Sequence, residues 1–315
     1  MTVHHNIFNL PVFTRAVVTI GTFDGVHAGH QQIIELMKAE AKAIGGETVI
    51  ITFHPHPRHI ISLDNTPIYL LNTIEERIDL LQNHGIDHLV IVPFTNELAN
   101  QSAEDFIKEF LVHSFHPHTI IIGYDHRFGK DRKGNYQLLE QKASEHSYKV
   151  KEIPVHILKD SAISSTKIRQ ALLSGDVETA NQFLNYDYFF TGLVVIGNRL
   201  GRTIGYPTAN LHIEDTDKLI PGDGVYIVTL TNEKWGSVSK RGMMNIGMRP
   251  TVNGKKRSIE VHIFDFNEDI YGEELQITLK KYLRGEVKFD GIESLKKQLS
   301  IDKEASLSFF SNLKN

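Results

Sequence analysis

The sequence predicts an α/β domain built on a parallel sheet, followed by a mainly antiparallel β-domain with helical cover at its C-terminal end. First, the 315 residues are enough for about two domains. Second, β-branched apolar runs alternate with amphipathic helical patterns in the first half, which is typical of a parallel sheet with helices on both faces. Third, strand-like runs follow one another after about residue 186, separated by Gly, Pro and Asn turns.

The composition is that of an ordinary globular protein and excludes several classes of function. Hydrophobic residues make up 41%, charged residues 23%, and the net charge is −4, so the chain has no basic field for nucleic acid. The absence of cysteine excludes disulfides, thiolate catalysis and Cys-based zinc sites. No signal-peptide pattern opens the chain, and no apolar stretch approaches ~18 residues. We expect a cytoplasmic protein with no membrane and no nucleic-acid partner, and its oligomeric state stays open.

The elements of the first half are predicted from periodicity. Strands are expected at residues 15–21, 48–53, 88–94 and 119–123, and helices at 31–44, 74–82 and 103–112. Ser102 is the expected N-cap of the last of these helices. Ligands of such sheets bind at the carboxyl ends of the strands.

The second half is predicted to be an antiparallel barrel or sandwich. Strand-like runs occupy residues 189–197, 224–230, 258–266 and 275–283, and two helical segments follow at 291–299 and 305–313. The predicted domains are therefore residues 1–186 and 187–315.

The stretch T-I-G-T-F-D-G-V-H-A-G-H, residues 19–30, places two histidines where a strand gives way to a helix. A Gly-containing turn before a helix start binds anions through unpaired N–H groups and the helix dipole. Gly29 allows a close approach of backbone to ligand, and His27 and His30, three apart, share one helix face. Both could donate hydrogen bonds to one phosphate group. The alternatives are two solvated histidines, or a histidine metal site that includes T-F-H-P-H-P-R-H at 52–59, although this lacks an H-E-x-x-H motif.

A second stretch, A-I-S-S-T-K-I-R at residues 162–169, opens an amphipathic helix with three hydroxyl side chains. Ser164, Ser165 and Thr166 can cap the helix or hydrogen-bond a polyphosphate. Lys167 and Arg169 stand in the first turn, where the helix dipole disfavours cations, and such a local conflict points to function. The alternative is a plain N-cap beside solvated charges.

Together, the H-x-G-H and I-S-S-T-x-x-R motifs resemble those of the nucleotidyltransferase superfamily. F-H-P-H-P-R at 53–58 and G-Y-D-H-R-F-G-K-D-R-K-G-N at 123–135 occur between them in order. The set is similar to the FMN adenylyltransferase module of the bacterial bifunctional riboflavin kinase/FAD synthetase family. This resemblance implies a nucleotidyltransferase domain with a Rossmann-like sheet, then a riboflavin kinase β-barrel.

The second half carries the kinase part of the resemblance. G-N-R-L-G-R-T-I-G-Y-P-T-A-N-L at 197–211 is similar to the kinase's glycine-rich ATP segment and its P-T-A-N motif. Glycines let a loop wrap phosphates, and Thr208 and Asn210 offer neutral oxygens to Mg²⁺, although P-T-A-N alone is more often a turn. The run I-E-V-H-I-F-D-F-N-E-D-I-Y-G at 259–272 implies that Glu260 is the kinase's general base. Strand alternation places Glu260 on the face opposite its aliphatic neighbours, where it could take a proton from a hydroxyl. The alternative is a glutamate that simply faces solvent.

The resemblance also implies the remaining site residues and the substrates, which are ATP, riboflavin and FMN with Mg²⁺. His27 and His30 would steady the α-phosphate during adenylylation. The ATP site of the adenylyltransferase would comprise Gly21, Phe23, Asp24, Gly29, Ser164, Ser165, Thr166 and Arg169. The ATP site of the kinase would comprise Gly201, Arg202, Gly205, Thr208 and Asn210. Asp125, Phe128 and Arg284 are the expected flavin contacts, Arg284 with a structural role as its alternative.

Two positions depart from the family pattern, and four further functions stay open. Thr22 stands where the family often has Asn, and His126 replaces a more usual apolar aromatic residue; both keep hydrogen-bonding capacity. A paralogue with one competent module, or a transferase for another phosphorylated acceptor, would share these motifs. A non-catalytic flavin-binding regulator and a histidine-metal hydrolase are the remaining two.

Overall fold

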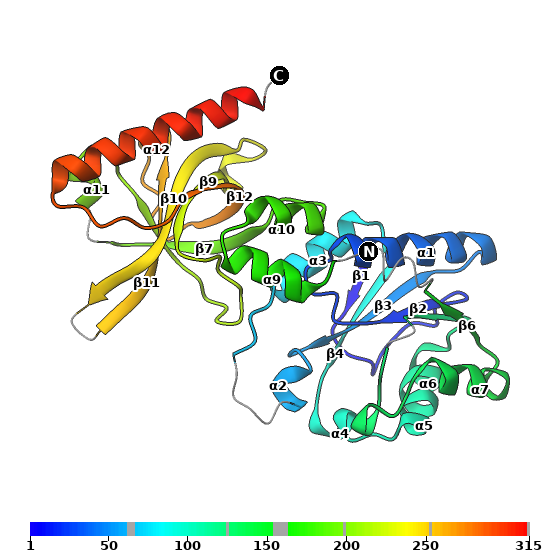
Figure 1. Cartoon of the computed structure of the whole chain (residues 1–315). Helices are drawn as coiled ribbons and strands as arrows, with labels where there is room; N and C mark the ends of the chain where they lie inside the picture. Colours follow the sequence, from blue (N-terminus) through cyan, green and yellow to red (C-terminus); the bar gives the residue numbers. More distant parts are fainter. Residues whose placement is uncertain (62–66, 124–125, 154–162, 198–199, 252–253, 314–315) are drawn as a thin grey trace. The chain divides into compact units, whose positions relative to one another are not determined.

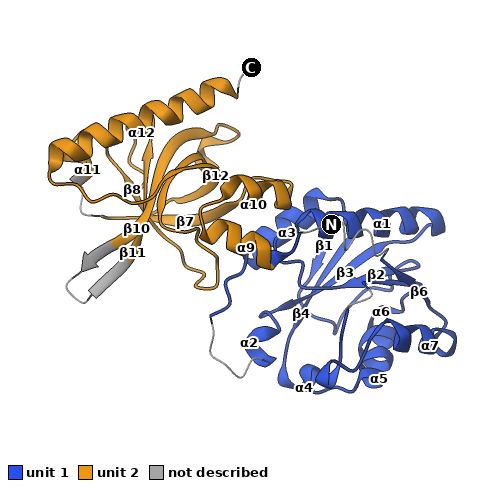
Figure 2. Ribbon diagram, viewed as in Figure 1, with its two compact units in different colours: residues 1–165 blue, residues 166–315 orange. Residues whose placement is uncertain are grey.

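A computed structural model describes residues 1–61, 67–123, 126–153, 163–197, 200–251 and 254–313. The chain forms two compact units, Met1–Ser165 and Thr166–Asn315 (Figure 2). This division sorts residues by their contacts and not by their activity. The functional boundary expected between residues 186 and 187 therefore stays a prediction.

The first unit contains a six-stranded sheet in the order β1-β4-β3-β2-β5-β6, with every neighbouring pair parallel (Figure 1). The parallel sheet expected from the alternating pattern is confirmed. Its strands are β1 (Thr2–His4), β2 (Val17–Ile20), β3 (Thr48–His54), β4 (His88–Pro93), β5 (Thr119–Ile122) and β6 (Lys149–Glu152).

Helices cover both faces of this sheet (Figure 1). The helical segments are α1 (Ala28–Ile44), α2 (Arg58–Ile61), α3 (Ile74–Asn83), α4 (Asn96–Ala99), α5 (Ala103–Asp105), a π-helical segment (Phe106–Val112), α6 (His113–Phe115), a 3₁₀ turn (Lys130–Arg132) and α7 (Tyr136–His146).

Alternate residues of each strand enter different cores. Val17 packs with Ile34 of α1 and Leu81 of α3, whereas Val18 packs with Phe110 and Leu139 on the opposite face. Because both faces are buried, β2 to β5 consist mainly of apolar residues, with a few buried threonines among them.

The strand order reverses direction beside β2. From β2 the chain passes through α1 to β3 on one side, and β5 lies on the other side. In open α/β sheets a crevice forms at the carboxyl ends of the strands at such a switch point. The H-x-G-H stretch leaves the carboxyl end of β2, so the topology places it at the binding edge.

The second unit contains a closed six-stranded antiparallel barrel in the order β10-β11-β8-β7-β12-β9. This settles the choice between barrel and sandwich. The strands are β7 (Phe189–Val195), β8 (Ala209–His212), β9 (Gly224–Thr231), β10 (Lys240–Thr251), β11 (Gly254–Ile263) and β12 (Glu274–Arg284). The strict in-out burial pattern of β7 is that of a strand with one face in the barrel interior.

Helices precede and follow the barrel strands. They are α9 (Ser165–Leu173), α10 (Val177–Leu184), α11 (Leu200–Thr203), a 3₁₀ turn (Glu233–Trp235) and α12 (Ile292–Asn312). The two helical segments expected at the C-terminal end form the single helix α12 (Figure 1). Its Phe310 packs with Ile227, Met243 and Phe264 of the barrel, which confirms the predicted helical cover.

The sequence patterns missed several short or weakly periodic elements. They include β1, β6, β8, α2, α4, α7, α10 and α11, and the longer strand β10 was missed as well. β6 is largely exposed and polar, so it lacks the apolar run that identified the central strands. The helix expected at 103–112 does begin after its cap Ser102, whose hydroxyl accepts the N–H of Asp105 at 3.0 Å, but most of it is π-helical.

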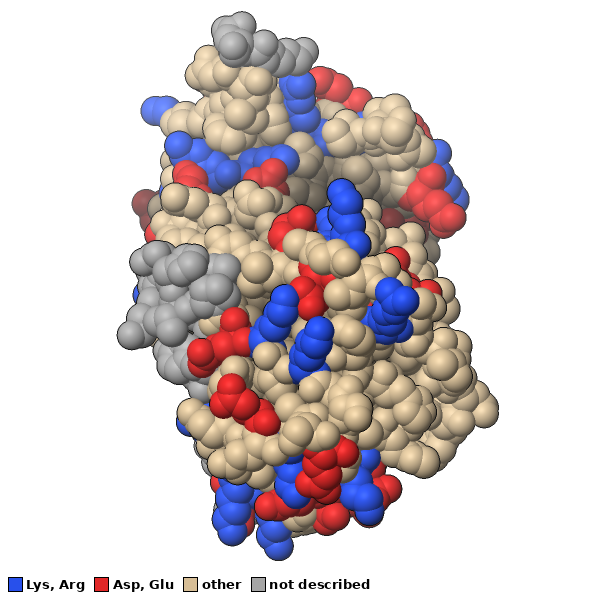
Figure 3. All heavy atoms as spheres, turned by 90° about the vertical axis from the view of Figure 1, so that its right-hand side faces the viewer, with Lys and Arg blue, Asp and Glu red and all other residues tan. Residues whose placement is uncertain are grey.

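The surface mixes both signs of charge. Figure 3 shows Lys and Arg side chains interspersed with Asp and Glu on the face drawn, in keeping with a net charge of −4. In the described part of the chain, no helix combines the length and the apolar character needed to cross a bilayer.

Candidate functional site

His27 is the N-cap of α1 and not simply a residue on its face. Its Nδ1 accepts the backbone N–H of His30 at 3.4 Å, and the two rings stack with centroids 3.8 Å apart and planes 13° from parallel. Because Nδ1 is the acceptor, the neutral imidazole of His27 carries its proton on Nε2. The cap thereby fixes which nitrogen of His27 can donate to a ligand.

The turn before α1 is held in a sparsely populated conformation. Phe23 has φ +48°, Gly25 φ +89° and Val26 φ +36°, and the left-handed region is especially unfavourable for a β-branched residue such as Val26. Such strain costs about 1–3 kcal/mol per residue and gathers at binding sites. The turn is supported by hydrogen bonds from the Val26 N–H to the Phe23 carbonyl at 3.0 Å and from Gln31 Nε2 to the Val26 carbonyl at 2.9 Å.

His30 is electrically neutral at neutral pH. Burial lowers its pKa well below 6.5, and the neighbouring His27 and Arg77 lower it further. Within the described residues, its Nδ1 is buried and makes no hydrogen bond. The first turn of α1 carries no acidic side chain to neutralise the helix dipole. The helix start thus offers N–H donors and a positive dipole to an anion.

Asp24 ties this turn to two other segments. The side chain is 1% exposed, and its Oδ1 accepts the N–H groups of Leu71 at 2.8 Å and Asn72 at 3.3 Å. Its carbonyl accepts the Ser165 hydroxyl at 2.9 Å, so the structure brings the I-S-S-T stretch to the H-x-G-H turn at this residue. Asp24 therefore has a clear structural role beside the ATP contact expected of it.

Gly21, Phe23 and Gly29 pack around the same turn. Phe23 is 2% exposed, and its ring centroid lies 4.8 Å from that of His30. A Cβ on Gly21 would lie 3.2 Å from the Phe23 ring, which explains the small residue there. Gly29 is buried in the first turn of α1.

The other phosphate ligands expected in the I-S-S-T-K-I-R stretch are more accessible than the turn itself. Ser164 and Thr166 are exposed, and Arg169 is half-buried in α9. Thr166 and Arg169 belong to the second compact unit. Their approach to the phosphates of ATP stays a prediction.

Sequence reasoning missed Arg77, a buried cation behind the turn. Arg77 is 2% exposed, and its Nη1 donates to the Thr52 hydroxyl at 3.4 Å, which in turn donates to the Thr22 carbonyl at 3.3 Å. The signal was present, because Arg77 falls on the same helical stripe as Ile74, Ile78 and Leu81. A charged side chain on an apolar helix stripe indicates that the charge is buried and has a polar partner there, as Arg77 has in Thr52.

The predicted flavin stretch is only partly described. Asp125 lies outside the described residues. Phe128 is 6% exposed, stacks on Phe106 with centroids 5.1 Å apart, and pairs with Gly134 across an isolated bridge. Its ring is part of the core beneath this loop, and a flavin contact stays a prediction. The sequence departure His126 is half-buried, with its ring 6.2 Å from that of Phe128.

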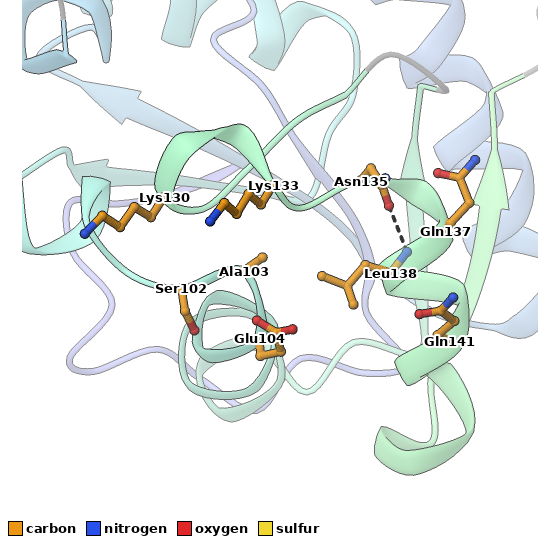
Figure 4. Close-up of a pocket in the computed structure, with 9 residues that line it drawn as sticks. All are labelled: Ser102, Ala103, Glu104, Lys130, Lys133, Asn135, Gln137, Leu138 and Gln141. Atoms are coloured by element: carbon orange, nitrogen blue, oxygen red, sulfur yellow. Dashed lines mark hydrogen bonds between the residues drawn. The ribbon is translucent and has the colours of Figure 1, made fainter.

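A surface cavity of about 470 Å³ lies beside this loop (Figure 4). Figure 4 shows Lys130 and Lys133 along one side, with Asn135 capping α7 through the N–H of Leu138 at 2.9 Å on the other. The two lysines are exposed, and Glu104 also lines the cavity.

In the barrel, the predicted kinase residues meet between β8 and β11. Glu260 faces Asn210 in the strand register, and the Thr208 hydroxyl donates to Glu260 Oε2 at 3.3 Å. Val261 and Ile259 point into the buried interior, whereas Glu260 is only half-buried, as the strand alternation predicted. A carboxylate thus lies beside a hydroxyl and an amide.

The glycines of the 197–211 stretch allow close packing around these residues. A Cβ on Gly197 would lie 2.2 Å from Asn210 Nδ2, and one on Gly201 would lie 2.2 Å from the Tyr206 carbonyl oxygen. Gly205 has φ +82°, a conformation that favours glycine, and open space beside it. Arg202 is exposed on the same segment.

Thr208 and Asn210 form a donor set that suits Mg²⁺, with the carboxylate of Glu260 beside them. Both side chains offer oxygen atoms, the ligand type that this hard cation prefers, and Mg²⁺ commonly takes few protein ligands beside substrate phosphates. No group of three or more His, Asp or Glu side chains placed to hold a metal occurs among the residues with a described structure.

Arg284 is held by the C-terminal helix. Its Nε lies 3.0 Å from Asp302 Oδ1 and its Nη2 lies 2.7 Å from Oδ2, while Gln298 also donates to Oδ1 at 2.9 Å. Asp302 is 4% exposed on α12. This bidentate pair gives Arg284 a structural role, and its approach to flavin stays a prediction.

Comparison with known proteins matches both halves of the chain. The family model for FAD synthetase matches residues 11–167, and that for riboflavin kinase matches residues 184–310.

Whole-chain relatives carry both names. The bifunctional riboflavin kinase/FMN adenylyltransferase of Bacillus subtilis is 38% identical over 95% of this chain and 94% of its own. The Escherichia coli K12 protein of the same name is 33% identical over 97% and 96%. The crystal structure of a macrolide-efflux protein from Streptococcus pneumoniae is 32% identical, covers 97% of this chain and 98% of its own, and superposes with a TM-score of 0.85.

The capped start of α1 lies in the part of the chain matched to FAD synthetase, and the Thr208–Glu260 pair lies in the part matched to riboflavin kinase. The chain belongs to the family of bifunctional riboflavin kinases/FMN adenylyltransferases, two-domain transferases in which a FAD synthetase domain precedes a riboflavin kinase barrel.

Proposed function

We propose that this chain phosphorylates riboflavin to FMN in its barrel and adenylylates FMN to FAD in its α/β unit, using one ATP for each transfer, in the cytoplasm. The observation that carries the proposal is that each unit holds its own site of the required kind. One is a helix start with two stacked histidines, of which burial keeps His30 neutral, and the other is a carboxylate paired with a hydroxyl.

In the barrel, Glu260 is the general base. It takes the proton of the ribityl 5′-hydroxyl as the oxygen attacks the γ-phosphorus of ATP, and the bond to ADP breaks. The strand register supports this role, because it presents Glu260 beside the P-T-A-N segment and away from the aliphatic interior. The backbone near Gly201 and Gly205 would wrap the phosphates, with Arg202 near their charge.

In the α/β unit, a phosphate oxygen of FMN attacks the α-phosphorus of ATP, and pyrophosphate leaves. His27 and His30 would donate to the α-phosphate and stabilise the charge that builds on its oxygens. Two observations support this assignment. The cap places the proton of His27 on Nε2, and burial keeps His30 neutral. Ser164, Ser165, Thr166 and Arg169 would hold the β- and γ-phosphates.

Mg²⁺ would be held in the barrel by Thr208 and Asn210. When bound, it would neutralise phosphate charge and hold the transferred group in line. Thr208 and Asn210 would orient it, while Glu260 keeps the proton-transfer role.

One incubation tests the proposal. Purified protein with riboflavin, ATP and Mg²⁺ should form FMN first and FAD later, resolved by chromatography, and FMN supplied directly should give FAD at once. Formation of FMN without FAD would indicate one competent module. Flavin binding without turnover of ATP would contradict both activities and indicate a flavin-binding regulator.

A further inference from the structure

His262 lies two residues after Glu260 on β11, on the same face of the strand, and the proposed mechanism gives it no task. It is 8% exposed. Its Nδ1 lies 2.8 Å from the carbonyl oxygen of Pro207, the residue directly before Thr208. This contact joins the strand that carries the general base to the segment that carries Thr208.

The contact fixes the tautomer of His262. A carbonyl oxygen only accepts hydrogen bonds, so Nδ1 must carry the proton. Burial lowers the pKa of His262, as does Lys303 on α12, while the Pro207 hydrogen bond and Asp265 act in the opposite sense. The imidazole is therefore neutral at neutral pH, with its proton on Nδ1.

The segment held by this bond is compact. The Tyr206 N–H donates to the Gly201 carbonyl at 2.8 Å, and a Cβ on Gly201 would collide with the Tyr206 carbonyl. The Tyr206 ring meets His262 edge to face at 5.2 Å, and Phe264 packs against His262 at 5.7 Å. His262 thus touches both residues that lead into Thr208.

We propose that His262 is a positioning residue for riboflavin phosphorylation, which holds the Pro207 carbonyl so that the Thr208 hydroxyl stays beside Glu260. Glu260 and His262 both belong to β11, and the hydrogen bonds that pair β11 with β10 and β8 fix their backbone positions. His262 touches no reacting atom. Its hydrogen bond to Pro207 holds the first residue of the P-T-A-N segment against β11. The inference rests on the proposed kinase role of Glu260 and Thr208.

Two variants separate the hydrogen bond from packing. His262→Asn keeps an N–H donor at the Nδ1 position, whereas His262→Leu keeps the bulk and leaves the Pro207 carbonyl without its donor. The cost of an unmade buried hydrogen bond predicts a loss of about ten- to a hundredfold in kcat/KM for MgATP in the kinase reaction of His262→Leu. His262→Asn should retain most of the activity.

The second activity of the chain is the internal control. FAD formation from supplied FMN should be unchanged in both variants, and Glu260→Gln should slow FMN formation about 10²–10⁴-fold whatever stands at position 262. Equal losses in His262→Leu and His262→Asn, or full activity in both, would overturn the proposal. A fall in thermal stability that lowers both activities together would likewise assign His262 a purely structural role.

A second measurement reads the tautomer in the unaltered protein, without relying on the activity of any variant. The ¹⁵N chemical shifts of His262, assigned as the signals lost in His262→Asn, should be those of the Nδ1–H tautomer, the less common form of free imidazole. The Nε2–H tautomer would overturn the proposal. Failure of the proposed function is distinguishable, because the unaltered protein would then form no FMN while its tautomer could still be measured.

Discussion

The two candidate sites of this chain are built in different ways. The candidate site at the start of α1 consists mainly of backbone features, namely the helix N–H groups and a strained turn. The side chain of His27 adds to them and is also the N-cap of the helix. Between β8 and β11, side chains from separate strands meet because the register brings them together. The first site is local in sequence, and the second is assembled from residues about fifty positions apart.

This difference has a consequence for substitution. A change in a local backbone site disturbs the helix start and the ligand contacts at once, since His27 serves both. A change in a strand-borne site removes one chemical group and leaves the barrel ladder in place. We therefore expect the barrel to tolerate removal of its catalytic group better in stability than the α/β unit tolerates loss of its cap.

The largest effect should be a reciprocal loss of the two activities. Glu260→Gln removes the general base and should slow FMN formation about 10²–10⁴-fold while FAD formation from supplied FMN persists. The double change His27→Ala with His30→Ala should do the reverse, because it removes the donors to the α-phosphate. Separate assays with riboflavin and with FMN measure both.

A matched variant separates the two tasks of His27. Asn is a preferred N-cap, so His27→Asn should keep the helix start intact, whereas His27→Ala should lose about 1 kcal/mol of stability. Both should lose FAD formation. Full activity in His27→Asn would mean that the imidazole serves only as a cap, and equal loss of both activities in folded protein would contradict the assignment of sites to units.

The next effect concerns Arg284, for which the sequence left two roles open. Arg284→Met leaves the carboxylate of Asp302 buried and without its bidentate partner, which should cost about 3 kcal/mol in the free energy of unfolding. Arg284→Lys, which keeps the charge but not the fork, should lose less. Thermal unfolding measures both variants. A raised KM for riboflavin with unchanged stability would instead indicate a flavin contact.

The smallest effect is a shift in the pH dependence of the α/β unit. Arg77 is one of the charges that lower the pKa of His30, so Arg77→Met should raise that pKa, while Arg77→Lys should leave it nearly unchanged. A histidine whose pKa is lower when folded than when unfolded costs stability as the pH falls below about 6.5 and the unfolded chain protonates. Arg77→Met should therefore lose less stability than the unaltered protein as the pH falls below about 6.5. NMR titration of His30 in both variants checks the direction, and an unchanged midpoint would contradict it.

The same contrast explains what could be predicted from sequence. The H-x-G-H site was readable because all its parts lie within twelve residues and each has a local reason, namely the glycine turn, the helix start and the histidine spacing. Ser165 was predicted as a phosphate ligand, which stays a prediction, and its hydrogen bond to the Asp24 carbonyl depends on packing of segments distant in sequence. Glu260 was chosen through the family resemblance, because strand alternation alone fits a solvated glutamate equally well.

Residues that act through others escaped prediction for a physical reason. Arg77 and His262 contact a hydroxyl and a carbonyl, and neither partner is near them in sequence. Arg77 carried a signal, because it is a charged side chain on the apolar stripe of α3, whereas His262 shares the non-aliphatic face of β11 with Glu260 and gave no such signal. β6 escaped for the opposite reason, since an edge strand with polar side chains gives no apolar run to detect.

The placement of α9 sets limits on how the two enzymes can be separated. Near its end, the Leu172 carbonyl accepts the Gly222 N–H at 3.0 Å, and Gly222 would collide with Leu173 if it carried a side chain. The helix that starts with an adenylyltransferase motif is thus packed on residues of the kinase unit. An α/β enzyme cut after residue 186 would lack the Gly222 N–H that the Leu172 carbonyl now accepts, and a barrel begun there would lack α9 and α10. A cut that leaves the second compact unit whole therefore falls at or before the start of α9, and it separates the Thr166 and Arg169 of the adenylyltransferase motif from the α/β sheet.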